Sequence, residues 1–289
     1  MNRVTLLAFA PGMALATALA GCASGSGDSR PTVVTSFYPL QFVVQQLTGD
    51  RVRVVNLTAP GVEPHDLELK PRQVAELADA DLVVYESKLQ PAVDAAVAQN
   101  AGDHALDVAG HVDLQDSNLH FWLDPVRLGT AATAIERRLT EIDPGDRSAL
   151  AGNLARLLDT LATLDHDFTT GLSQCERDVI VTSHDAFGYW SRYGVRTESI
   201  AGLSPDVEPS ATHLDELRSM IETNHVTTVF SETLASPKMA DVLAHDLGVG
   251  TAVLDPIEGL AAGSTGDYLS LMRANLAALQ KANGCRVNP

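Results

Sequence analysis

The sequence predicts an α/β fold made of two doubly wound lobes joined by one long rigid helix. Short β-branched segments alternate with helical patterns in the first half of the chain, and the same rhythm returns in the second half. A long helical pattern separates the two halves. Such alternation is typical of parallel sheets covered by helices. The chain has 289 residues, of which 45% are hydrophobic, and this is enough for two cores.

The first half contains three short apolar segments bounded by Gly, Pro or Asp, which predict strands. These segments are residues 32–37, 51–57 and 81–86. Helical patterns follow them at residues 39–48, 71–78 and 91–99. Together they indicate a βαβ arrangement, and we assign it to an N-terminal lobe at residues 31–142.

A long helical pattern follows this lobe. Asp143 suits the cap position of a helix and Pro144 its first turn. Leucines then recur at helical spacing as far as Leu172. A helix of about 28 residues would be about 40 Å long. We expect this linker helix within residues 143–173, where it can connect the two lobes.

The second half repeats the rhythm of the first. Strands are predicted at residues 178–182, 227–231 and 250–254, and helices at residues 213–224, 236–247 and 265–282. We assign residues 174–289 to a C-terminal lobe.

The N-terminus departs from this pattern. Arg3 precedes a short apolar stretch, which ends in the small residues before Cys22. A positive residue, a short apolar run and small residues are typical of a secretory signal, and the run is short for the alternative, a membrane-spanning anchor. Residues 23–30 are polar and rich in Gly and Ser, as expected of a flexible tether. We therefore expect residues 1–22 to be a signal peptide and the rest of the chain to be extracytoplasmic.

The net charge and the cysteines bear on the partners of the protein and on its disulfides. The net charge is −17 without any long basic run, which excludes DNA and RNA as partners because binding a polyanion needs clustered cations. Cys175 and Cys285 remain after Cys22. Export would permit a disulfide between them, and two separate buried thiols are the alternative.

Four polar side chains stand at positions that suggest one metal site. His65, His184 and Asp255 each follow a predicted strand, and His120 belongs to the N-terminal lobe. Ligands of open α/β sheets bind beyond the carboxyl ends of the strands, so the four side chains would meet in the cleft between the lobes. Three imidazoles and one carboxylate suit Zn²⁺ and suit Ca²⁺ or Mg²⁺ poorly. Taken singly, each histidine could equally be a hydrogen-bonded interior residue or an exposed surface residue. Asp255 is also suited to cap a turn before Pro256.

The surroundings of these residues carry a family resemblance. The segments are GVEPHDLELKPR at 61–72, HFWLDP at 120–125, TSHDAFGYW at 182–190 and LDP at 254–256. In order and context they resemble the metal-binding substrate-binding proteins of ABC transporters, a cluster of zinc and manganese receptors and lipoprotein adhesins. The resemblance extends over almost the whole chain after the tether, although residues 111–119 lack the long His-rich loop of many zinc-type members.

The resemblance implies a binding protein and not an enzyme. It implies that His65, His120, His184 and Asp255 are the metal ligands, that the linker helix is stiff, and that an ABC permease is the partner. His at position 184 is similar to zinc-type members, whereas many manganese-type members have Glu there. Leu-Ala-Gly-Cys resembles a lipobox, which implies cleavage before Cys22 and a lipid anchor on its thiol. We expect a monomer.

Three alternatives remain open from the sequence. One is a manganese receptor of the same family. Another is a zinc hydrolase, if Asp255 points away from the metal and Glu232 acts as a base. Glu232 otherwise accepts a hydrogen bond from a ligand imidazole or caps a helix. The third is a surface adhesin that holds metal as a structural ion.

Overall fold

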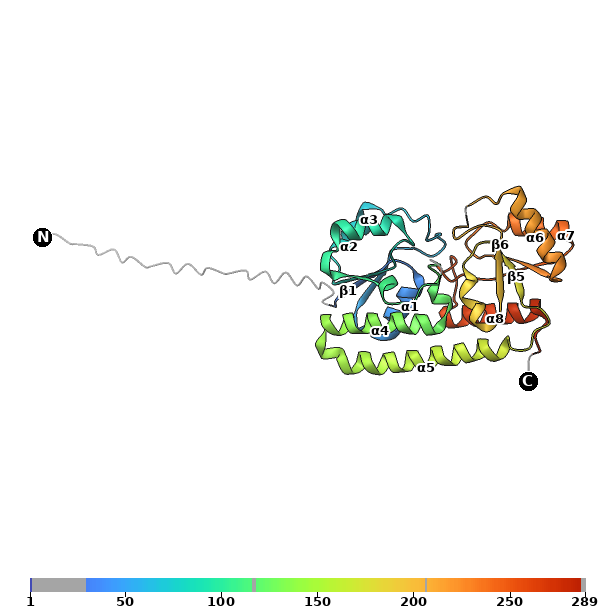
Figure 1. The fold of residues 1–289 in the computed structure, drawn as a ribbon. Helices are drawn as coiled ribbons and strands as arrows, with labels where there is room; N and C mark the ends of the chain where they lie inside the picture. Colours follow the sequence, from blue (N-terminus) through green and yellow to red (C-terminus); the bar gives the residue numbers. More distant parts are fainter. Residues whose placement is uncertain (2–29, 116–117, 206, 287–289) are drawn as a thin grey trace.

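The computed structural model describes residues 1, 30–115, 118–205 and 207–286, and it has two parallel sheets side by side above long helices (Figure 1). This arrangement is the two-lobed α/β fold that the sequence predicts. Cys22 and the predicted signal peptide, apart from Met1, lie outside the described residues, as does the tether except for Arg30. Within the described ranges, no helix is long and apolar enough to cross a bilayer.

The N-terminal sheet has the strand order β2-β1-β3-β4, and all neighbouring strands are parallel. Valines fill both faces, with Val33 in the core beneath the sheet and Val34 in the core above it. Because both faces of these strands are buried, their sequences are continuous apolar runs without alternation of polar residues. The strands are β1 (Thr32–Thr35), β2 (Arg53–Asn56), β3 (Leu82–Tyr85) and β4 (Ala105–Asp107), and the helices are α1 (Tyr38–Thr48), α2 (Pro71–Ala78) and α3 (Pro91–Asn100).

The C-terminal sheet repeats this topology with the order β6-β5-β7-β8. Its strands are β5 (Val179–Thr182), β6 (Arg196–Ser199), β7 (Thr228–Ser231) and β8 (Gly250–Val253). Its helices are the 3₁₀ helix η6 (Phe187–Tyr193), α6 (Ala211–Thr223), α7 (Lys238–Leu247) and α8 (Tyr268–Asn283). In each sheet the second strand lies on one side of the first strand and the third strand lies on its other side. The point where the strand order switches is where open α/β sheets bind ligands.

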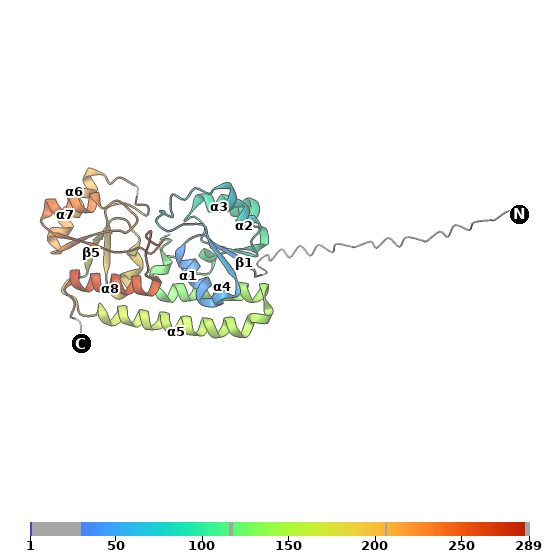
Figure 2. The same cartoon turned by 180° about the vertical axis from the view of Figure 1, so that it is seen from behind.

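Two long antiparallel helices run beneath the lobes (Figures 1 and 2). Helix α4 (Pro125–Ile142) begins at Asp124, whose side chain accepts a hydrogen bond from Val126 N. Helix α5 (Arg147–Gly171) has 25 residues and is therefore about 38 Å long. It extends from the N-terminal lobe to the C-terminal lobe. The sequence pattern predicts α5 but not α4, and Pro144 lies in a short 3₁₀ turn instead of the first turn of α5.

The two lobes share one apolar core. A single cluster of buried side chains includes Phe37 from the N-terminal lobe, Phe168 from α5 and Trp190 from the C-terminal lobe. Hydrogen bonds also cross between the lobes: Trp122 Nε1 donates to Pro256 O at 2.7 Å, and Trp190 Nε1 donates to Leu123 O at 3.0 Å. The lobes are therefore packed against each other as well as connected by the chain.

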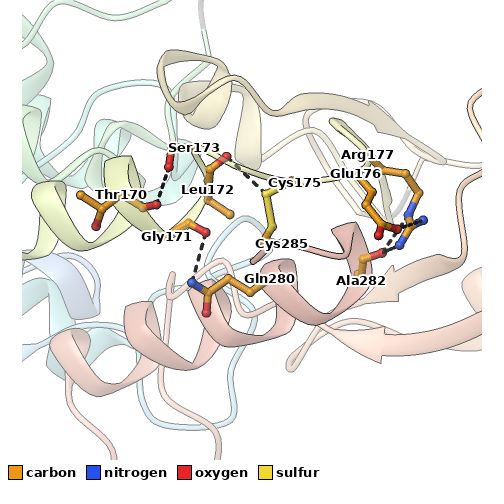
Figure 3. Close-up of a disulfide and its surroundings, with 10 residues drawn as sticks. All are labelled: Thr170, Gly171, Leu172, Ser173, Cys175, Glu176, Arg177, Gln280, Ala282 and Cys285. Atoms are coloured by element: carbon orange, nitrogen blue, oxygen red, sulfur yellow. Dashed lines mark hydrogen bonds and ion pairs between the residues drawn. A yellow bond between two sulfur atoms is a disulfide. The ribbon is translucent and has the colours of Figure 1, made fainter. Parts of the chain in front are cut away.

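Cys175 and Cys285 form a disulfide at the far end of α5 (Figure 3). It joins the segment that leads from α5 into β5 to the residues that follow α8. Two hydrogen bonds flank it, from Arg286 N to Gln174 O at 2.9 Å and from Gln280 Nε2 to Gly171 O at 3.2 Å. The disulfide thus fastens α8 to the exit of α5.

Candidate metal centre

Four side chains from four loops meet where the two lobes face each other. His65 lies in the loop after β2, His120 in the loop before α4, His184 in the loop after β5, and Glu258 in the loop after β8. One donor atom from each lies within 4.8 Å of the donor atoms of the others. The His120, His184 and Glu258 side chains are 1% exposed and that of His65 is 12% exposed. The site is thus almost closed to water.

Three of the donor atoms, from His120, His184 and Glu258, have the spacing of a tetrahedral shell, and His65 lies beside them. His120 Nε2 and His184 Nε2 lie 3.2 Å apart, and they lie 3.0 Å and 3.2 Å from Glu258 Oε1. His65 Nε2 lies 3.5 Å from Glu258 Oε2. Ligands at about 2.0–2.1 Å from a tetrahedral zinc ion lie about 3.3 Å from one another. The buried His65 Nε2 also has no hydrogen-bond partner, as expected of an atom reserved for a ligand.

Glu232, at the end of β7, fixes the orientation of His184. Its Oε2 accepts a hydrogen bond from His184 Nδ1 at 2.6 Å, and its Oε1 accepts one from His184 N at 2.9 Å. The contact lies beside the switch point of the C-terminal sheet, between β5 and β7. It leaves Nε2 of His184 directed at the other donor atoms. A carboxylate on the far nitrogen of a ligand imidazole sets the tautomer of that ligand and raises its basicity.

Asn118 holds His120 in the same way with an amide. Its Oδ1 accepts hydrogen bonds from His120 N at 2.9 Å and from His120 Nδ1 at 2.8 Å. Asn118 is not among the site residues predicted from the sequence. Its position could have indicated this role, because Asn118 lies two residues before a predicted ligand. An Asn or Asp side chain at such a position commonly accepts a local backbone hydrogen bond.

The His65 loop rests on the loop that carries Glu258. Gly61 N donates to Leu260 O at 2.7 Å. Gly61 has a φ of 84°, and a Cβ at this position would lie 3.3 Å from Ala262 Cβ. Glycine therefore suits both the backbone conformation and the close contact between the loops. Glu63 Oε1 also accepts a hydrogen bond from His65 N at 3.1 Å.

Burial and hydrogen bonding shift the pKa values of the site residues in different directions. Burial, the largest influence on His120, lowers its pKa to about 4. Burial acts in the same direction on His184, but its hydrogen bonds to Glu232 and Glu258 together raise the pKa to about 10. Burial alone would raise the pKa of Glu258, yet the three imidazoles hold it well below its usual range. Without a metal ion, His184 therefore carries a proton at neutral pH and Glu258 is ionised.

The structure places Asp255 outside this group, which corrects the expectation from the sequence. Asp255 Oδ1 accepts a hydrogen bond from Ile257 N, and Oδ2 accepts one from Thr233 Oγ1, both at 2.8 Å. The carboxylate thus stabilises the turn after β8. Ile257 then adopts a left-handed conformation with a φ of 58°, and Glu258 is the carboxylate that reaches the histidines. Glu258 is not among the residues predicted from the sequence, although it too follows β8.

Comparison with protein families gives one match over residues 33–282, to the ZnuA family, described as the periplasmic component A of a zinc-uptake complex. The chain is 33% identical to the zinc-binding lipoprotein AdcA of Streptococcus pneumoniae over 282 residues, which are 88% of this chain and 56% of AdcA. It is also 33% identical to the high-affinity zinc uptake system protein ZnuA of Bacillus subtilis, covering 89% of each chain. The chain thus spans about half the length of AdcA.

Solved structures share the fold. The Zn(II)-bound ZnuA-like domain of S. pneumoniae AdcA has a TM-score of 0.76 and 32% identity, over 88% of this chain and 99% of that domain. The laminin-binding protein Lmb of Streptococcus agalactiae, described as bifunctional with adhesin and metal-transporting activity, has a TM-score of 0.80 and 28% identity, over 87% of this chain and 99% of that one. The similarity therefore covers both lobes and the helices that connect them.

Proposed function

Because this chain belongs to the ZnuA family of zinc-uptake components, we propose that it is an extracytoplasmic receptor that captures Zn²⁺ as its cargo and delivers it to an ABC permease. One observation supports the proposal above all: three imidazole nitrogens and a carboxylate oxygen come within 4.8 Å of one another in a buried site, which is the donor set of a four-coordinate zinc ion. The zinc-binding relatives support the same cargo. The membership is in a family of uptake components and not in an enzyme family.

The donor set favours zinc over the alternatives. His65, His120, His184 and Glu258 would supply all four positions of the shell. Three nitrogen donors suit Zn²⁺, whereas Mn²⁺ is suited by oxygen donors. A hydrolase needs an open position for a water molecule, and four protein ligands leave none. Glu258 also neutralises part of the charge of the ion in a site that excludes water.

Capture in this proposal is an exchange of a proton for a metal ion. The imidazoles must be neutral to bind, and His184 carries a proton while the site holds no metal. Glu232 keeps its hydrogen bond to Nδ1 while Nε2 takes the ion in place of that proton. Because the lobes share a core, we expect release to involve movement of the ligand loops and not a wide separation of the lobes. We further propose that acylation of Cys22 anchors the protein to the membrane.

Metal content tests the proposal. The chain beginning at Ala23 is purified from a medium that contains zinc and manganese together, and its metal is quantified by mass spectrometry. His184→Ala removes one donor, whereas His166→Ala is a matched control because His166 is exposed on α5. One zinc ion per chain, retained in the control and lost in His184→Ala, supports the proposal. Manganese at this ratio overturns the assignment of zinc, and a chain that binds neither metal overturns the receptor.

A further inference from the structure

Asn118 connects the two ligand loops across the boundary between the lobes. Its Oδ1 accepts from His120, and its Nδ2 donates to Asp185 O at 2.8 Å. Asp185 directly follows His184. The backbone O of Asn118 accepts a hydrogen bond from Tyr189 OH at 2.6 Å. Asn118 is 7% exposed, so its amide is held between His120 of one lobe and the His184 loop of the other.

The carbonyl of Asp185 determines which way this amide points. A backbone carbonyl only accepts hydrogen bonds, so the atom of Asn118 that faces it is the amide NH₂. Oδ1 therefore faces His120, and because Oδ1 only accepts, Nδ1 of His120 carries the hydrogen. In a neutral imidazole the other nitrogen then has a free lone pair. That nitrogen is Nε2, which faces Glu258 and His184.

We propose that Asn118 is a positioning residue, which fixes the metal-binding tautomer of His120 and couples His120 to the loop that carries His184. The proposal rests on the function proposed above, since it assigns the tautomer its role in binding zinc. Because its side chain contacts both loops, Asn118 keeps Nε2 of His120 and Nε2 of His184 in fixed positions relative to each other. Asn118 itself is not a metal ligand.

The site uses different acceptors for its two buried imidazoles. Nδ1 of His184 faces the carboxylate of Glu232, whereas Nδ1 of His120 faces a neutral amide. The amide accepts from His120 and donates to Asp185 O at the same time, whereas a carboxylate only accepts. Aspartate at position 118 would keep the acceptor, but it would lose the donor and place a carboxylate against a carbonyl. Asn118→Asp therefore separates the two roles.

The test compares three variants of the chain from Ala23. Asn118→Ala removes all three hydrogen bonds of the amide, and Asn118→Asp removes only the one that the amide donates to Asp185 O. Asn153→Ala is the matched control, because Asn153 Nδ2 donates to Leu47 O at 2.6 Å, between α5 and α1. Zinc affinity is measured by competition with a chromophoric chelator, and the zinc dissociation rate by stopped flow. The tautomer of His120 is read from ¹⁵N side-chain shifts of the metal-free and zinc-loaded chains, assigned with His120→Gln.

We expect Asn118→Ala to weaken zinc affinity about 10–100-fold, as for other partners of metal-bound histidines, and to leave His120 in a mixture of tautomers when metal-free. Asn118→Asp should keep the hydrogen on Nδ1 of His120 and recover most of the affinity, while zinc dissociates faster than from the parent chain. Asn153→Ala should match the parent in every zinc measurement.

Two results would overturn the proposal. One is an unchanged affinity and tautomer in Asn118→Ala. The other is an equal loss of affinity in both Asn118 variants with the His120 tautomer preserved, which indicates a merely structural role. If the parent chain fails to bind zinc, the proposed function fails; the ¹⁵N shifts of the metal-free chains still decide whether Asn118 fixes the tautomer.

Discussion

Replacing Glu258 or Asp255 tests which of the two carboxylates after β8 binds the metal. Glu258→Gln preserves the size of a side chain that is 1% exposed, but it removes the negative charge among the four donors. Asp255→Asn removes a charge of the same kind only three residues away, where the carboxylate accepts hydrogen bonds from Thr233 and Ile257. The structure predicts that only the first change weakens zinc binding.

The magnitude follows from the position of Glu258 in the shell. Changes to residues that merely support a metal ligand reduce affinity about 10–100-fold, so loss of a ligand should reach at least about 100-fold. A factor of 100 in affinity lowers the stabilisation by saturating zinc by about 2.7 kcal/mol. For a chain of this size, the zinc-induced rise in Tm should therefore shrink by about 5–10 °C. Asp255→Asn should cost about 1 kcal/mol in the metal-free protein and leave the zinc-induced rise unchanged.

The assay is thermal unfolding of each chain with and without zinc, combined with chelator competition at one pH. Comparing the zinc-induced rise, and not the Tm itself, removes any effect of a substitution on the metal-free fold. If Asp255→Asn loses the rise while Glu258→Gln keeps it, the assignment of Glu258 is refuted and the expectation from the sequence is restored.

Three further predictions concern the surroundings of the site. Glu232→Gln should weaken zinc binding about 10–100-fold in chelator competition, because the hydrogen bond to His184 loses its charge; an unchanged affinity would show that Glu232 does not support the ligand. Since the pKa of His184 is raised to about 10, zinc binding at pH 8 should release about one proton, and affinity should rise about tenfold per pH unit until the pH approaches 10. Calorimetry in buffers of different ionisation enthalpy measures this release, and a value near zero would contradict the protonation of His184. Replacing both Cys175 and Cys285 by Ser should lower stability by about 2–4 kcal/mol, seen in denaturant unfolding, without changing zinc affinity.

Strands such as β1 and β3 are predictable because their own residues favour a strand, whereas β4 and β6 are not among the predicted strands. The valines of β1 and β3 are buried on both faces, which produces short β-branched runs. Strand β6 has the sequence RTES and lies at the edge of the sheet beside β5, so its identity as a strand comes from pairing and not from hydrophobicity. Helix α4 contains Gly129 and three threonines, residues with low helix propensity, and its packing against α5 outweighs them.

The histidines of the site are predictable for a different reason. His65 and His184 follow strands whose carboxyl ends face the cleft, so their meeting is a consequence of topology. The carboxylate is not predictable in this way, because Asp255 and Glu258 both follow β8. The choice between them depends on the left-handed backbone of Ile257, a conformation that a β-branched residue rarely adopts and that no sequence pattern indicates. Ile257 is fully buried, and its packing maintains that conformation.

The continuous core beneath both sheets has a consequence for protein engineering. Residues such as Phe37, Phe168 and Trp190 belong to a single buried cluster, so either half expressed alone would expose apolar surface that the other half normally covers. The two halves are therefore not exchangeable modules, even though their sheets have the same strand order. A chimera that takes one half from a relative would have to preserve the packing of this shared cluster before its four metal ligands could come together.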